Sequence, residues 1–216
     1  MTVSIMNRLT WTLFETLEYP LFSAADLQNI EPNANIRYAL VKRAMRDGDL
    51  VQLKRGLYTL CPSLRKRPLN RPALANRLYF PSYVSLEYAL SAQGWIPEGV
   101  ITITSATSKN QATFDTPEGH FTYRRIPQAQ FFCGVETVSS EDGSWLQARP
   151  LKALADYVYL HGLAWTDRKP LIESLRIDED ELETLDADDF DSIQGNYQTA
   201  VNVESFLSGL RKDLHV

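Results

Sequence analysis

The chain has 216 residues, 44% of them hydrophobic, which is enough for one large or two modest domains with buried cores. A formal net charge of −5 argues against a generally basic nucleic-acid-binding protein. The charge is unevenly distributed, however. Residues 1–78 contain 12 lysines and arginines and 6 acidic residues, a net charge of +6, whereas residues 79–216 contain 10 and 21, a net charge of −11. Only the first part therefore suits a polyanionic partner.

Two short helices are predicted at the start of the chain. Leu9, Leu13 and Leu17 recur at helical spacing and predict a first helix over residues 7–18. Ser23 is placed to cap a second helix over residues 24–30, with Asp26 as the acidic partner of a capping box. This helix should end at the Glu31-Pro32 step, because the residue before a proline disfavours the helical region.

A longer helix with two different faces is predicted over residues 35–47. On a wheel of about 100° per residue, one arc carries the expected core side chains, which are Leu40, Val41, Ala44 and Met45. The opposite arc carries Asn35, Ala39, Lys42, Arg43 and Arg46. We therefore expect one face to pack against a core and the other to be basic.

A β-hairpin is predicted after Gly48. Two apolar runs, residues 50–53 and 57–60, flank Lys54-Arg55-Gly56, where glycine supplies the positive φ that a short turn needs. The tip of the hairpin would be cationic. Two helices followed by this hairpin predict a winged helix-turn-helix domain over residues 1–60.

In such a domain the second helix of the pair enters the major groove, and a neighbouring basic turn reaches phosphates. The residues expected to contact double-stranded DNA are therefore Asn35, Arg37, Tyr38, Lys42, Arg43, Arg46, Lys54 and Arg55. The alternative is that these cations form an ordinary solvated helix face and a polar turn. DNA binding is favoured by the order of the elements and by the presence of cations both on the helix and at the tip of the hairpin.

Residues 61–78 are expected to form a basic, proline-containing linker and a connecting helix. Three prolines and four cations fall within residues 61–72 and predict an exposed segment, followed by a short helix over residues 72–79. The cations either follow a phosphate backbone beside the hairpin or keep the segment soluble.

The rest of the chain, residues 79–216, predicts a mixed α+β domain with an antiparallel sheet and flanking helices. β-Branched and aromatic runs joined by polar turns predict strands over residues 100–107, 111–114 and 120–126, and a further hairpin over 131–138 and 144–148. Helices are expected over residues 85–93, 150–161, 167–175, one or two between 178 and 193, and 199–213.

One hydroxyl-rich strand end in this second part invites a functional interpretation. Lys109 follows a run of threonines and serines, and Arg124 and Arg125 lie on an expected neighbouring strand. These cations could contact a phosphate or an RNA backbone. Polar ladders on the solvent face of a sheet are the commoner explanation.

The sequence predicts no catalytic residue, metal site or other cofactor. The three histidines lie far apart, and neither a phosphate-binding glycine loop nor a nucleophile motif is present. The acidic run over residues 178–191 lacks the glycine and the ligand spacing of a calcium loop, and acidic residues are favourable at helix N-termini without any metal.

Cys61 and Cys133 suggest neither a disulfide framework nor a zinc site, which indicates a reducing compartment. No apolar run approaches the length of about 18 residues that spans a membrane, and the first residues lack the layout of a signal peptide. We expect a cytoplasmic protein without a membrane partner.

Four segments taken in order resemble the AbiEi-type antitoxins of bacterial type IV toxin-antitoxin systems. They are LVQLKRGLYTL, SYVSLEYALSAQGWIPE, ITITSATSKNQATFDTPEGHFTYRRIP and RPLKALADYVYLHG, and the similarity covers roughly residues 7–161. The chain departs from the family pattern at Arg149-Pro150, where a Thr-Pro-Glu-like start is expected, and in the acidic tail after Asp178.

This resemblance implies a transcriptional repressor and antitoxin in a phage-defence system. The first domain would bind inverted repeats in its own operon, and the second would oppose a nucleotidyltransferase-like toxin encoded beside it. Two alternatives come from other classes. One is a protein-interaction module whose acidic second domain masks a basic partner, and the other is a nucleic-acid enzyme, which the lack of a clustered carboxylate or histidine site disfavours.

Overall fold

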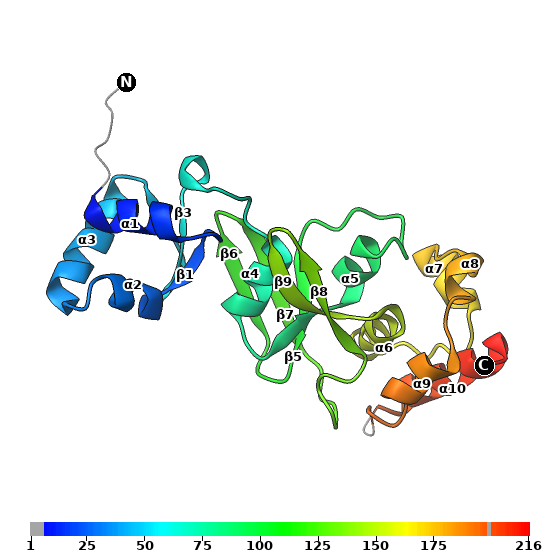
Figure 1. The fold of residues 1–216 in the computed structure, drawn as a ribbon. Helices are drawn as coiled ribbons and strands as arrows, with labels where there is room; N and C mark the ends of the chain where they lie inside the picture. Colours follow the sequence, from blue (N-terminus) through cyan, green and yellow to red (C-terminus); the bar gives the residue numbers. More distant parts are fainter. Residues whose placement is uncertain (1–6, 198–199) are drawn as a thin grey trace. The chain divides into compact units, whose positions relative to one another are not determined.

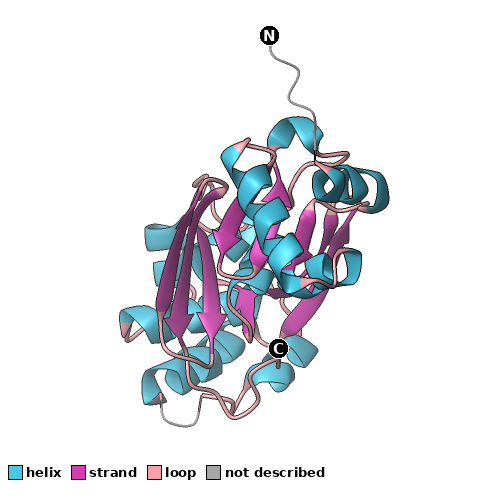
Figure 2. Cartoon of the chain, turned by 90° about the vertical axis from the view of Figure 1, so that its left-hand side faces the viewer, coloured by secondary structure: helices cyan, strands magenta, loops and turns pink. Residues whose placement is uncertain are grey.

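The computed structural model describes residues 7–197 and 200–216, and the chain is mixed α+β (Figures 1 and 2). It divides into two compact units. The first runs up to Leu74 and includes two hairpin turns from later in the chain, Thr116–Glu118 and Ser139–Gly143. The second contains the remainder, from Ala75 onward. Among the described residues, none of the helices is both long and apolar enough to cross a membrane.

The first unit begins with three helices and a small sheet. Its elements are α1 (Arg8–Thr16), β1 (Leu21–Ser23), α2 (Ala24–Ile30), α3 (Ala34–Arg46), β2 (Leu50–Lys54), β3 (Leu57–Leu60) and the 3-10 helix η1 (Pro62–Leu64). The three strands form an antiparallel sheet in the order β1-β3-β2, with Phe22 opposite Tyr58. The expected helices and hairpin are present, whereas β1 was not predicted.

The predicted cap of α2 is confirmed. The hydroxyl of Ser23 accepts a hydrogen bond from the backbone N–H of Asp26, and the Asp26 carboxylate accepts one from the backbone N–H of Ser23. This reciprocal arrangement satisfies two donors that the first turn would otherwise leave unpaired. The next helix, α3, is capped by Asn33, whose side chain accepts from the backbone N–H groups of Asn35 and Ile36.

One hydrophobic core holds these elements together. Its fully buried members are Leu9, Leu13, Phe22, Leu27, Ala44, Leu50 and Leu60. From α3, Leu40 and Val41 also pack against this core, as predicted. The prediction for Met45 is wrong, because its side chain is 38% exposed. Met45 follows Ala44 by one residue, a rotation of about 100° that carries it off the narrow buried stripe.

The second unit contains a larger sheet and most of the helices. Its strands are β4 (Ser82–Val84), β5 (Ile103–Thr107), β6 (Ala112–Thr116), β7 (Gly119–Arg125), β8 (Val135–Ser140) and β9 (Gly143–Ala148). The helices are α4 (Arg71–Leu78), which spans the division between the units, α5 (Leu86–Ala92), α6 (Pro150–His161), α7 (Lys169–Leu175), α8 (Glu179–Leu182), α9 (Ala187–Ile193) and α10 (Val201–Leu214). The expected first residue of the last helix, at position 199, lies outside the described residues.

The larger sheet has the order β6-β7-β5-β4-β9-β8 and is mixed, so the prediction of an antiparallel sheet is wrong. The pair β4 and β5 is antiparallel, whereas β5 and β7 are parallel, and so are β4 and β9. The reason is that β6 lies at the outer edge. The chain therefore turns twice between β5 and β7, and both strands run in the same direction.

The central strand β4 was missed in the sequence. It has only three residues, Ser82–Val84, which is too short for an alternating pattern to be recognised. All three are buried, because β5 pairs with one edge and β9 with the other. It therefore lies inside the sheet, between β5 and β9.

The helix α6 is the centre of the helical side of this unit. Seven of its residues are buried, including Leu151, Leu154 and Val158, and it packs against α5, α9 and α10. A helix that is covered on several sides is expected to be apolar around most of its circumference. Two buried charged residues, Lys152 and Asp156, depart from that rule.

Candidate functional site

The outward face of α3 carries most of the residues predicted to contact DNA. Asn35, Tyr38, Lys42 and Arg46 are all exposed, and their spacing of three, four and four residues places them along one side of the helix. Tyr38 is 69% exposed, a larger fraction than for any other described tyrosine, phenylalanine or tryptophan. Lys42 makes neither a hydrogen bond nor an ion pair with any described residue. This face is available to a ligand.

Two arginines at the end of α3 share one carboxylate. Arg43 Nε lies 3.4 Å from Asp47 Oδ2, and Arg46 donates to Asp47 Oδ1 over 3.1 Å. Both arginine side chains are exposed, and ion pairs made by exposed side chains contribute little to stability. The carboxylate partly neutralises the two cations and orients them at the last turn.

Arg37 differs from the other predicted contacts. Its guanidinium donates to the backbone oxygens of Glu31 and Pro32, over 2.7 and 3.0 Å. These oxygens belong to the turn between α2 and α3. The structure therefore places one guanidinium nitrogen of Arg37 on that turn, where two backbone oxygens accept from it.

The turn between β2 and β3 carries the other predicted cations. Gly56 has φ of +80°, as the short turn requires, and its carbonyl oxygen accepts from the backbone N–H of Ala24 at the start of α2. Arg55 is exposed at the tip, and Lys54 is half-buried beside an irregularity in the β2–β3 register. The tip is thus cationic, and it is anchored to the first residue of the helix pair.

The cations of the predicted linker are largely held by the first unit itself. Arg65 donates to Leu60 O over 2.8 Å and pairs with Glu118, and its side chain is only 8% exposed. Lys66 donates to the backbone oxygen of Glu15, and Arg67 to that of Glu141. The prediction of an exposed linker is therefore wrong for Arg65. Its positive charge is matched by a carboxylate, whereas the sequence alone suggested a solvated cation.

The second predicted cationic group is only partly assembled. Arg124 and Arg125 are exposed on β7 and lie opposite Ala106 and Thr107 of β5. Lys109 donates from Nζ to the backbone oxygen of Phe80. The neighbouring hydroxyls are used inside the fold, since Thr104 donates to Ser85 O and Thr107 to Pro81 O. The hydroxyl-rich surface expected beside the cations is therefore not formed.

The acidic run over residues 178–191 forms the starts of two helices. Asp178 caps α8, and Asp186 forms a capping box with Asp189 at the start of α9. These carboxylates accept backbone hydrogen bonds and lie at the positive ends of the helix dipoles. Several of the acidic residues therefore have a local structural role.

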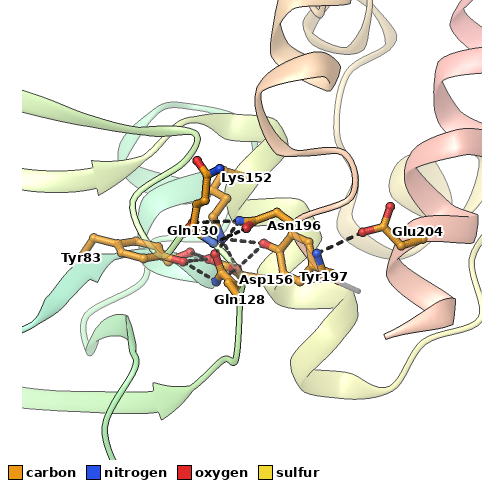
Figure 3. Close-up of polar contacts among 9 residues, drawn as sticks. Tyr83, Gln128, Gln130, Lys152, Asp156, Asn196, Tyr197 and Glu204 are labelled. Carbon is orange, nitrogen blue, oxygen red and sulfur yellow. Dashed lines mark hydrogen bonds and ion pairs between the residues drawn. The ribbon is translucent and has the colours of Figure 1, made fainter. Parts of the chain in front are cut away.

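A polar cluster that the sequence analysis missed lies inside the second unit (Figure 3). Its centre is the buried carboxylate of Asp156, which accepts hydrogen bonds from five side chains: those of Tyr83, Ser85, Gln128, Lys152 and Tyr197. Figure 3 shows Tyr83 approaching from one side and Tyr197 from the other. The cluster therefore joins the sheet, α6 and the segment before α10.

The segment before α10 is held by further polar contacts. The amide of Asn196 donates to the side-chain oxygen of Gln128, and its own oxygen accepts from the backbone N–H of Gln130. The carboxylate of Glu204 accepts from the backbone N–H groups of Gly195 and Tyr197, both over 3.0 Å (Figure 3). These contacts fix the chain where it enters α10.

Burial shifts the pKa values of the cluster. Removal from solvent lowers the pKa of Lys152, and the nearby Asp156 carboxylate opposes that shift. Burial, reinforced by Asp156, raises the pKa of Tyr83 and of Tyr197 well above the usual value. The two phenols therefore stay protonated and act as donors to the carboxylate.

The contacts around Asp156 favour a structural role for the cluster. A carboxylate offers about four lone-pair sites, and five donors are already directed at this one. A substrate would have to displace several of them. The signal that could have revealed the cluster was the pair Lys152 and Asp156, four residues apart in an otherwise apolar stretch.

Comparisons with known proteins do not identify a family. The chain matches no protein-family model and none of the curated proteins.

Proposed function

We propose that the first unit is a winged helix-turn-helix domain that binds double-stranded DNA. Support comes from the order of its elements: α2 and α3 are joined by a short turn and followed by the β2–β3 hairpin (Figure 1). A helix-turn-helix presents its second helix to the major groove. Here that helix is α3, and the hairpin is the wing.

The observation that carries the proposal is the composition of the exposed side of α3. Most of this helix faces solvent, and the outward residues Asn35, Tyr38 and Lys42 leave their side chains available. Amide, aromatic and cationic groups on one side are the groups that read and hold a duplex.

The wing supplies the second contact. Arg55 is exposed at the tip, and the tip is held against Ala24 by a backbone hydrogen bond. A cation on an anchored turn meets a phosphate with less loss of conformational freedom than one on a mobile loop. We assign Lys54 and Arg55 to the phosphate backbone.

The wider function in the proposal is that of a transcriptional repressor and antitoxin. The chain would repress the operon that encodes it, and its second unit would oppose a nucleotidyltransferase-like toxin. The order of the four segments quoted above supports this part, through their resemblance to AbiEi-type antitoxins. Direct contact with the toxin is not required by the proposal.

Fluorescence anisotropy of the full chain with labelled duplexes tests DNA binding. We expect tighter binding to DNA from upstream of the chain's own reading frame than to a scrambled duplex, and a fall in affinity between about 50 and 200 mM salt. Arg55→Gln should reduce the slope of log affinity against log salt by about 0.9 on both duplexes, since a phosphate contact carries no sequence information. Lys169→Gln, an exposed cation of the second unit, is the matched control. Equal affinity for both duplexes would contradict a sequence-specific repressor.

A second candidate function is a protein-interaction module that masks a basic partner. It is favoured by the charge of the second unit, in which 11 lysines and arginines less 18 acidic residues give −7. Many of the acidic side chains in residues 178–191 are exposed, including Asp178 and Asp186, which also cap helices. Co-purification with the product of the neighbouring gene, lost above about 0.5 M salt because screening weakens exposed charge pairs, would support this candidate.

A further inference from the structure

The cations of α3 are distributed unevenly along the helix. Three of its four cations, Lys42, Arg43 and Arg46, lie in the second half of the helix. Lys42 is exposed and has no partner among the described residues, whereas Arg43 and Arg46 share Asp47. Arg37 is the one cation in the first two turns, and it donates hydrogen bonds to backbone oxygens of the turn before α3. The exposed side of the first two turns is therefore neutral.

That neutral part has a definite composition. Tyr38 and Ala39 follow Asn35 by three and four residues, so the three lie on one side of the helix, and all three are exposed. Ile36, at the edge of the same turn, is 47% exposed. The side-chain amide of Asn35 makes no hydrogen bond to any described residue, because the cap at Asn33 engages only its backbone N–H. This part of the helix therefore exposes an amide without a described partner, a tyrosine and an alanine.

Base recognition in the major groove follows from such groups. An asparagine amide pairs with the N6 and N7 edge of adenine, whereas arginine and lysine pair with guanine. Alanine and aromatic side chains make apolar contact with the methyl group of thymine. In a helix-turn-helix, the residues near the start of the second helix contact the bases. The small side chain of Ala39 lets the helix approach closely.

We propose that α3 reads A·T base pairs through Asn35, Tyr38 and Ala39, while Arg43 and Arg46 contact phosphates. This inference rests on the proposed function and specifies its ligand: a duplex whose half-site places adenine and thymine under the first two turns of α3. Asn35 pairs with adenine, and Tyr38 and Ala39 cover thymine methyl groups. The position of Arg43 on the helix would also allow a contact with a base edge. In this proposal it contacts a phosphate and shows no base preference.

Selection of duplexes from a randomised library by the full chain tests the assignment. We expect enrichment of a half-site rich in A·T pairs. Asn35→Ala should then weaken binding to the selected duplex by about 10-fold or more and leave binding to a scrambled duplex unchanged. Asn110→Ala, an exposed asparagine of the second unit whose backbone oxygen alone is bonded, is the control.

Replacing thymine by uracil in the selected half-site tests the apolar contacts separately. Uracil lacks the methyl group and keeps the same hydrogen-bonding edge, so affinity should fall several-fold for the natural chain. After Tyr38→Ser the loss on changing thymine to uracil should be smaller. Thermal unfolding of each variant shows whether it is folded.

The outcomes separate the two proposals. Binding of selected duplexes enriched in G·C pairs, or an equal effect of Asn35→Ala on selected and scrambled DNA, would overturn the reading of A·T pairs while DNA binding stands. Failure to retain any duplex at low salt would overturn both.

Discussion

Lys152 Nζ lies 2.5 Å from Asp156 Oδ1, one turn apart on α6, and neither side chain exposes any surface to solvent. The two charges are not equally supported. Lys152 has two hydrogen-bond acceptors, Asp156 and the Tyr197 hydroxyl, whereas Asp156 has four donors besides the lysine. This asymmetry predicts different costs for removing each partner.

Asp156→Leu should destabilise the second unit by about 3–5 kcal/mol, because it leaves a buried ammonium and several buried donors without an acceptor. Lys152→Met should cost less, since the carboxylate keeps its neutral donors from Tyr83, Ser85, Gln128 and Tyr197. Urea unfolding followed by far-UV circular dichroism measures both free energies. Lys169→Met, at an exposed position, is the control. An equal or larger loss for Lys152→Met would contradict the asymmetry.

Alkaline pH should destabilise the folded chain through its buried tyrosines. Burial raises the pKa of Tyr83, Tyr123 and Tyr197, so the folded state keeps protons that the unfolded chain releases above about pH 10. Stability therefore falls as pH rises beyond that value, by up to about 1.4 kcal/mol per pH unit for each tyrosine. The lowered pKa of Lys152 acts in the opposite direction, but only up to the usual lysine value of 10.5.

Absorbance at the tyrosinate band measures this titration. The buried Tyr83, Tyr123 and Tyr197 should ionise only together with unfolding. Tyr197→Phe should remove the contribution of one of these three tyrosines to the loss of stability at alkaline pH. A smooth titration of all tyrosines in the folded chain would argue against their burial.

Gly209→Ala should disrupt the packing of α10. A Cβ atom built on Gly209 overlaps the backbone carbonyl of Thr166, and backbone cannot move aside as a flexible side chain can. We expect a loss of about 3 kcal/mol or more, at the upper end of overpacking costs. Thermal unfolding measures the loss. Gly99→Ala is the matched control, because a Cβ there meets no atom within 4 Å. A shift no larger than that of the control would show that α10 does not pack closely at Gly209.

Arg65→Met should destabilise the first unit by about 1.5–3 kcal/mol. The substitution removes a charge-assisted hydrogen bond to Leu60 O and leaves the Glu118 carboxylate without its cation. Lys42→Met, which removes an exposed cation with no described partner, should change stability by less than about 0.5 kcal/mol. Calorimetry on the full chain compares the two. Equal effects would indicate that the Arg65 pair is solvated.

The sequence by itself determined the elements whose signals are local. The capping box at Ser23 and the glycine turn at Gly56 depend on residues three or fewer positions apart, and both are as predicted. The outward side of α3 was also readable, because helical periodicity assigns one side to the core and the other to solvent. Met45 was misplaced because a wheel gives the direction of a side chain but not the width of the buried stripe.

Tertiary structure decided the features that depend on distant residues. The short strand β4 is recognisable only from its neighbours β5 and β9, which begin some 20 and 60 residues later. The parallel pairing of β5 and β7 follows from the edge position of β6, which no local pattern encodes. The Asp156 carboxylate accepts from side chains as far as 73 positions away in the sequence. Hydrogen bonds and burial on this scale arise from the packing of elements, so they became visible only once the chain was folded.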